Sequence, residues 1–233
     1  MKKLVILFLI LFVTSGCTID YEIYYKNKKN VQEKVSIGVE QNVINDYSNS
    51  AEDYFYEIFN GWKQSYDLKK YKYDVKTKAR YSYINLIKNH DSIKELLENE
   101  ILDQIFSTKD VYEKDNNIMV TLSDYVYATA QSEMYLESND SDMFTLSIKF
   151  KSNYKVECNA DEKNNFTGTY IWHFDKNSLD KKINIKLTEQ LNLSAFIINN
   201  SFILILLGIT LIGLIGYIII KKIIKRKNMI NEL

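Results

Sequence analysis

The chain has 233 residues, 46% of them hydrophobic and 26% charged, which suits one domain of ordinary size. Its 30 basic and 30 acidic residues give a formal net charge of +0, which argues against a nucleic-acid partner, because nucleic-acid-binding domains concentrate positive charge on one surface. With no proline and only 7 glycines, the chain has no proline-rich linker and little room for a glycine-rich phosphate-binding loop.

The N-terminal residues are typical of a secretory signal. Two lysines precede an apolar run from Leu4 to Val13, and the small residues Thr14-Ser15-Gly16 come directly before Cys17. The apolar run is too short to span a bilayer, so we expect residues 1–16 to be a cleaved signal peptide. The small residues before Cys17 resemble the lipobox of bacterial lipoproteins, which implies a diacylglyceryl group, carrying palmitate or a similar chain, on its sulfur. The alternative is an ordinary signal peptide followed by an incidental cysteine.

Alternating apolar and polar residues predict an antiparallel sheet in the region that follows. The longest alternation runs from Tyr71 to Tyr83 and predicts one long, half-buried strand, because successive side chains of a strand point to opposite faces. Sheets buried on both faces give continuous apolar runs instead, so one face of this sheet is expected to be wet. Shorter alternations of the same kind occur at 35–39, 118–122, 144–150, 154–158, 170–174 and 183–187.

Two helices are also predicted. Residues 50–60 carry apolar side chains at helical spacing, and Gly61 is placed as a C-terminal stop. A capping-box spacing at Ser92 opens a second helix whose apolar residues at 93, 97, 101 and 105 lie on one side. The residues Asp115-Asn116-Asn117 predict the turn of a β-hairpin. We therefore expect an α+β fold, a mostly antiparallel sheet with two helices packed on one face.

A second apolar segment lies near the C-terminus. Phe202 to Ile220 contains no charge, and about 20 apolar residues at ~1.5 Å rise cover a hydrocarbon core of ~30 Å, so we expect a transmembrane helix at 196–220. Basic residues follow at once, and they mark the cytoplasmic side of a membrane span. The expected order is therefore a signal peptide at 1–16, an extracellular α+β domain at 17–195, the span, and a cytoplasmic tail at 221–233. Residues 188–201 are either a short stalk or an outward extension of the span.

Residues suited to catalysis are few. Cys158 continues an alternation of buried residues, so we expect it to pack in the core rather than act as a nucleophile. His90 is expected in the loop that caps the second helix, and His173 on the exposed face of its strand. The sequence contains no Cys-x-x-Cys or His-Glu-x-x-His motif and no EF-hand loop. We therefore expect no enzyme activity, no cofactor and no metal site.

The stretch NADEKNNFTGTYIWHF, within residues 153–187, carries a resemblance to a known group of proteins. Its asparagine-rich turn leads into the strand Tyr170-Ile171-Trp172, and this hairpin resembles one in the LppM-type membrane lipoproteins and related uncharacterised Gram-positive proteins. The order of signal, β-rich ectodomain, span and basic tail is similar as well. The resemblance implies an α+β module that faces the cell envelope, with no catalytic residues to carry over.

Together these features predict a lipoprotein of the cell membrane, with its ectodomain outside and its C-terminus in the cytoplasm. Its expected role is to contact a lipid, a wall polymer or a membrane protein; the alternative is an accessory subunit of a secretion or transport complex. Basic residues on the wet face of the predicted long strand form a candidate ligand site, because cations ~6.6 Å apart along a strand suit repeated phosphates. The same charges could instead protect an edge strand from pairing. This basic stripe consists of Lys72, Lys76, Lys78 and Arg80.

Overall fold

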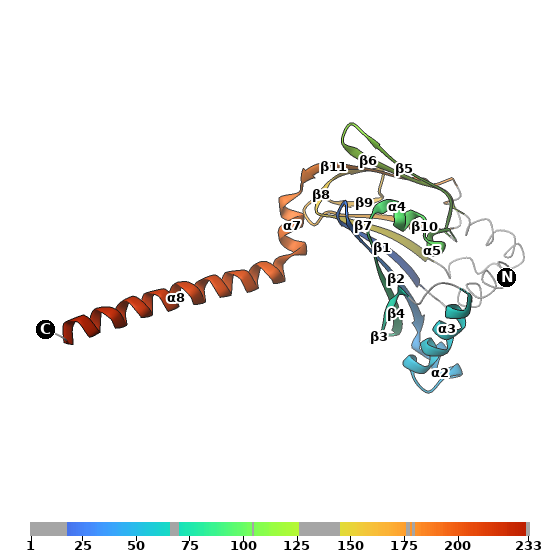
Figure 1. Ribbon diagram of the computed structural model, residues 1–233. Coiled ribbons are helices and arrows are strands. Elements are labelled where there is room, and N and C mark those ends of the chain that lie inside the picture. The colour runs from blue at the N-terminus through green and yellow to red at the C-terminus, as the bar shows by residue number, and fades with distance from the viewer. Residues whose placement is uncertain are drawn as a thin grey trace, which may run out of the picture.

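A computed structural model describes residues 18–65, 70–103, 105–125, 145–175, 178 and 180–231. The fold is α+β and mostly sheet, as the sequence predicts, with a few short helices and one long helix at the C-terminus (Figure 1). The predicted signal peptide and Cys17 lie outside the described residues. Lipidation of Cys17 therefore stays a prediction.

The strands form two sheets rather than the single sheet expected from the alternations. They are β1 (Thr18–Asn27), β2 (Asn30–Glu40), β3 (Lys72–Lys78), β4 (Tyr81–His90), β5 (Phe106–Lys114), β6 (Asn117–Tyr125), β7 (Thr145–Ser152), β8 (Tyr154–Cys158), β9 (Glu162–Asn164), β10 (Thr169–Phe174) and β11 (Ile183–Leu191). The larger sheet has the order β3-β4-β2-β1-β7-β10-β9, and the smaller has the order β5-β6-β11-β8. Neighbouring strands are antiparallel except β1 and β7, which run parallel.

The two sheets bury a common core. Aromatic side chains join them: Phe174 of β10 lies 5.6 Å from Phe106 of β5 and 4.9 Å from Tyr125 of β6, measured between ring centroids. Trp172 of β10 is fully buried in the same cluster, which also contains the inward residues of β1, β2, β6 and β11. Alternate residues of each central strand point into this core, so the period of two in the sequence reflects burial on one face.

The predicted long strand at 71–83 is a hairpin, so this prediction is wrong. Strand β3 ends at Lys78, Ala79 adopts a left-handed backbone with φ of 53°, and β4 begins at Tyr81. Val75 pairs with Ile84, and both lie on the core side of the sheet, whereas Tyr81 and Tyr83 belong to the opposite face. A two-residue turn reverses which face the odd positions occupy, and the alternation alone does not reveal that change.

The helices are α2 (Gln41–Tyr47), α3 (Ala51–Ser65), α4 (Ile93–Leu97), α5 (Glu100–Asp103), α7 (Leu193–Asn199) and α8 (Ser201–Asn231). Helix α3 continues past Gly61, which therefore does not stop it. The capping box at Ser92 is confirmed, because its hydroxyl accepts a hydrogen bond from the amide of Glu95 at 3.1 Å. The second predicted helix is divided into α4 and α5.

The predicted hairpin turn at 115–117 is confirmed. It joins β5 to β6, and both central residues have positive φ, 51° at Asp115 and 60° at Asn116. Aspartate and asparagine tolerate this left-handed conformation better than other residues with side chains, and its twist matches that of the flanking strands.

A buried carboxylate holds the centre of the larger sheet. Glu33 of β2 is fully buried, and Tyr21 of β1 donates a hydrogen bond to its Oε1 at 2.7 Å. Its Oε2 accepts hydrogen bonds from the Tyr71 hydroxyl at 2.6 Å and the Asn99 amide at 2.5 Å, and lies 2.9 Å from His90 Nε2. A buried carboxylate needs several donors to offset the loss of water, and these four residues supply them.

This cluster corrects the sequence-based placement of His90. His90 is the last residue of β4 and its side chain is fully buried against Glu33, rather than part of the loop that caps the second helix. The cluster also affects Tyr21. Burial is the largest cause, and the nearby charge of Glu33 the second, of a pKa of its hydroxyl well above the ordinary value.

The C-terminal region continues from the smaller sheet. Strand β11 ends at Leu191, and Asn192 caps the short helix α7 by accepting a hydrogen bond from the amide of Ala195 at 3.3 Å. Helix α8 follows and extends away from both sheets (Figure 1). Over the residues that the structure describes, no helix combines the length and the apolarity needed to cross a membrane.

We expect Glu33→Gln to lower the free energy of unfolding by about 1–3 kcal/mol, because a neutral amide accepts fewer and weaker hydrogen bonds from the four donors. Urea unfolding of the full chain in detergent, followed by intrinsic fluorescence, measures this change. Glu98→Gln is the control, because Glu98 is exposed just after α4. Equal stability of the two variants would contradict a central role for Glu33.

Candidate functional site

One end of the domain gathers several loops around the start of α8. Strands β1 and β7 run parallel and both end there, and β11 ends beside the start of β8, where Leu191 pairs with Tyr154. The turns at 27–30, 115–116 and 165–168 lie at the same end, since each joins strands that meet there. We call this region the α8 end. Thr18, at the other end of β1, marks the far end.

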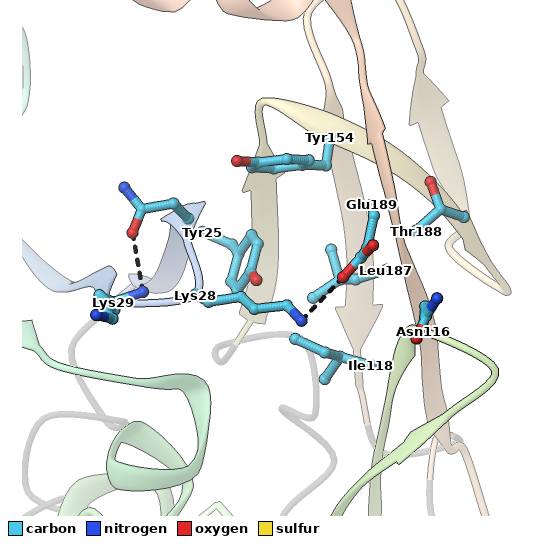
Figure 2. A pocket seen from close by; sticks show the side chains of 10 residues that line it. Tyr25, Lys28, Lys29, Asn116, Ile118, Tyr154, Leu187, Thr188 and Glu189 are labelled. Carbon is cyan, nitrogen blue, oxygen red and sulfur yellow. Dashed lines mark hydrogen bonds and ion pairs between the residues drawn. The ribbon is translucent and has the colours of Figure 1, made fainter.

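A pocket of about 460 Å³ opens at the α8 end, between the β1–β2 turn and the smaller sheet (Figure 2). Four segments that are far apart in the sequence contribute to it. It is lined by Tyr25, Asn27, Lys28, Lys29, Asn116, Ile118, Tyr154, Leu187, Thr188 and Glu189.

The apolar wall of the pocket consists of two aromatic and two aliphatic side chains. The rings of Tyr25 and Tyr154 meet edge to face, with centroids 5.8 Å apart. Leu187 and Ile118 occupy paired positions on β11 and β6, so their side chains lie on the same face of the smaller sheet. Burial raises the pKa of Tyr25 to about 12, with a smaller contribution from Tyr154. The ionised form of Tyr25 is therefore disfavoured in this wall.

An ion pair crosses the rim of the pocket. Lys28 Nζ in the β1–β2 turn lies 3.0 Å from Glu189 Oε1 on β11 (Figure 2). It also lies 4.0 Å from Glu113 Oε1 on β5. The hydrogen bond to Glu189 raises the pKa of Lys28. Because the pair is exposed, its contribution to stability is small. It nevertheless connects the β1–β2 hairpin of the larger sheet to β11 of the smaller sheet.

The chemistry of this pocket favours binding. Its wall is apolar and aromatic, and its rim carries amides, a hydroxyl, lysines and a carboxylate, the usual composition of a small-ligand site. Histidine and cysteine are not among its described lining residues. Within the described part of the chain, no group of three or more histidine, cysteine, aspartate or glutamate side chains is arranged to hold a metal ion.

The basic stripe lies elsewhere. Lys72, Lys76 and Lys78 occupy alternate positions of β3, which is an edge strand, and Arg80 follows in the β3–β4 turn. Lys76 forms a 2.7 Å ion pair with Asp74 on the same face. The turn lies at the far end of the domain, since β4 begins opposite Glu40. The stripe and the pocket are therefore separate candidate sites.

Two other residues singled out in the sequence lie as predicted. Cys158 is partly buried and packs against the core, where burial raises the pKa of its thiol. His173 is exposed on β10, and its Nε2 lies 2.7 Å from Glu162 Oε1 on the neighbouring strand. Neither residue lies in the pocket.

The pocket itself was not predicted from the sequence. Its residues lie on β1, β6, β8 and β11 and in two turns, and only the folded arrangement brings these together. The alternation of Ile19, Tyr21, Ile23 and Tyr25 was the one signal that could have identified β1 and with it the aromatic wall.

No family model and no curated protein matches this sequence. Among solved structures, the NMR structure of the folded domain of Mycobacterium tuberculosis LppM is similar, with a TM-score of 0.49 and 9% sequence identity. The similarity covers 77% of this chain and 94% of that chain. Membership of the LppM-type lipoproteins stays a prediction.

We expect Tyr25→Phe to make the protein less sensitive to alkali. In the wild type, stability should fall as the pH rises from about 10 to about 12, because Tyr25 ionises in the unfolded chain while the folded chain still holds its proton. Phenylalanine cannot ionise, so this part of the loss disappears. Urea midpoints of the full chain in detergent at pH 8, 10, 11 and 12 measure it, with the pH 8 value as the reference for each protein. Parallel curves for the two proteins would show that Tyr25 is not the group responsible.

Proposed function

We propose that this protein is a lipoprotein of a Gram-positive cell membrane that presents a non-enzymatic α+β binding module on the outer side. In this proposal α8 spans the membrane, a lipid on Cys17 adds a second attachment, and residues 221–233 lie in the cytoplasm. The membrane, rather than a nucleic acid, is the surface on which the protein works.

The observation that carries the proposal is the exposure of apolar side chains on α8. Among the side chains that the structure describes between Phe202 and Ile219, ten large apolar ones are each 50% or more exposed. They are distributed around the helix, so packing one face of α8 against the domain would leave the others exposed. A helix that is apolar on all sides needs an apolar surrounding, and a lipid bilayer supplies one. The uncharged run from Phe202 to Ile220 would extend over about 28 Å as a helix, close to the thickness of the hydrocarbon core.

The charges that flank the run support its orientation. Lys221, Lys222, Lys225, Arg226 and Lys227 follow it directly, and such residues favour the cytoplasmic side. The secretory signal at residues 1–16 independently favours an N-terminus outside the cell.

Two surfaces are available to an extracellular partner. The pocket at the α8 end would lie next to the membrane, which favours a lipid as its ligand. The basic stripe runs along the edge strand β3, away from the pocket, where an anionic wall polymer could reach Lys72, Lys78 and Arg80, none of which forms an ion pair within the described part of the chain. A membrane protein is the third class of partner.

The alternative is an accessory subunit of a secretion or transport complex. A single membrane span and a short tail would suit such a role. A stoichiometric partner recovered from gently solubilised membranes would favour this alternative over an independent binding module.

We expect protease added to intact protoplasts to digest the α+β domain and to leave α8 with its tail. The membrane protects a span and whatever lies behind it, so an antibody to a C-terminal epitope tag should detect a small protected fragment. Permeabilised protoplasts are the control, in which the tag should be lost as well. A fully protected chain would reverse the orientation, and complete release of the tagged fragment into the medium would refute the span.

We expect a clickable fatty-acid analogue to label the protein in living cells through Cys17. A diacylglyceryl group needs the thiol, so Cys17→Ala should abolish the label, whereas Cys158→Ala should retain it. Immunoprecipitation followed by in-gel fluorescence measures the label. Equal labelling of wild type and Cys17→Ala would contradict lipidation at this residue.

A further inference from the structure

Large apolar side chains are exposed together at the α8 end, outside the pocket. Their exposed fractions range from 37% for Ile198 to 67% for Phe166, which is well above those of residues that pack in the core. Soluble surfaces seldom expose several such side chains side by side without a function. We call this set the apolar patch; it consists of Phe166, Leu191, Leu193, Ile197 and Ile198.

Hydrogen bonds hold the two parts of the apolar patch together. The side-chain amide of Asn192, next to α7, donates to the carbonyl oxygen of Asn165 at 2.6 Å, and that of Asn199 donates to the carbonyl oxygen of Thr167 at 3.5 Å. Helix α7 therefore lies against the β9–β10 turn, and Phe166 projects from the middle of that turn.

Gly168 makes this close approach possible. Its φ is +64°, and a Cβ at this position would lie 2.1 Å from the carbonyl oxygen of Ser152 and 2.9 Å from the Cβ of Ala195. Only glycine fits both the backbone conformation and the space. The turn that carries Phe166 is thus fixed against β7 and α7.

Helix α7 has an inner and an outer face. Ala195 is fully buried against the turn, while Leu193 and Ile197, four residues apart, lie together on the exposed side. An amphipathic segment with its apolar side exposed is typical of helices that lie in the headgroup region of a membrane.

The chain itself places the apolar patch beside the proposed membrane span. Helix α7 ends at Asn199 and α8 begins at Ser201, and Figure 1 shows α7 across the end of the sheets with α8 leaving from it in another direction. Lysines lie at the same end, since Lys28 and Lys29 are exposed at the β1–β2 turn. Lysines beside an exposed apolar surface suit a bilayer that contains anionic lipids.

We propose that the apolar patch inserts into the outer headgroup region of the membrane that α8 spans, so that the domain rests on the bilayer through α7 and the β9–β10 turn. This inference depends on the proposed function, because the apolar patch meets the bilayer only if α8 crosses it. The occupant is the lipid surface; a second copy of the chain or another protein on the apolar patch would be a different outcome of the test.

Quenching of introduced tryptophans by brominated lipids tests the inference on the full chain. The protein is reconstituted in vesicles of phosphatidylglycerol and phosphatidylcholine brominated near the headgroup or near the chain ends, and the signal of the native tryptophans is subtracted. Three single variants are compared: Phe166→Trp in the apolar patch, Leu211→Trp in the middle of the uncharged run of α8, and Tyr47→Trp as an exposed control on α2, outside the apolar patch.

We expect Phe166→Trp to be quenched several-fold more than Tyr47→Trp by the shallow bromines, and Leu211→Trp to be quenched most by the deep ones. Adding Leu193→Gln and Ile197→Gln to Phe166→Trp should reduce its quenching. Quenching of Leu211→Trp without quenching of Phe166→Trp would overturn the inference and leave the proposed span intact, including when a second copy covers the apolar patch. Absence of quenching at Leu211→Trp would refute the proposed span itself.

Discussion

The buried carboxylate of Glu33 is the constraint on which the larger sheet depends. A charge without water must be surrounded by donors, and these donors come from four different places in the chain. Tyr21 lies on β1, His90 on β4, Tyr71 just before β3, and Asn99 between α4 and α5. The requirement to satisfy one carboxylate therefore sets how these segments meet. It also accounts for the break in the second predicted helix, because Asn99 leaves the helix to reach Glu33.

Much of the local structure could be predicted from the sequence, and most of the long-range arrangement could not. The capping box at Ser92 and the hairpin turn at Asp115 and Asn116 depend on neighbouring residues only, and both predictions are confirmed. The strand predicted from Tyr71 to Tyr83 is a hairpin, because a turn with Ala79 at positive φ exchanges the faces without breaking the alternation. Division into two sheets depends on strand pairing, which a period of two does not specify.

The two candidate sites differ in how far the sequence alone could reveal them. The basic stripe was found in the sequence because its three lysines follow one another along a single strand with Arg80 just after it, and the structure places that strand at an edge. The pocket needed the fold, because Tyr25, Tyr154 and Leu187 come from three strands in two sheets. Strand β1 was not predicted from the sequence. Tyr24 on its outer face is as large as its inward neighbours Ile23 and Tyr25, so the alternation of apolar and polar residues is obscured there.

The positions of the two proposed membrane attachments determine how the domain would lie relative to the membrane. Thr18 and Tyr25 are separated by about 23 Å along β1, so the α8 end and the residue after Cys17 are at opposite ends of the larger sheet. A lipid on Cys17 and a span at α8 can enter one membrane only if β1 lies along its surface. The apolar patch would then hold one end of the domain, and the lipid the other.

Energy transfer from both ends of the domain to the membrane surface tests this account most directly. Donor dyes are attached at Asp115→Cys at the α8 end or Ala79→Cys at the far end, both exposed turn positions, in a Cys158→Ser background. The lipidated full chain is reconstituted in bilayers that carry acceptor dyes on their headgroups. Strong and similar transfer from both positions is the predicted result. Strong transfer from residue 115 with weak transfer from residue 79 would mean that the domain stands upright on α8 alone, and would contradict attachment at both ends.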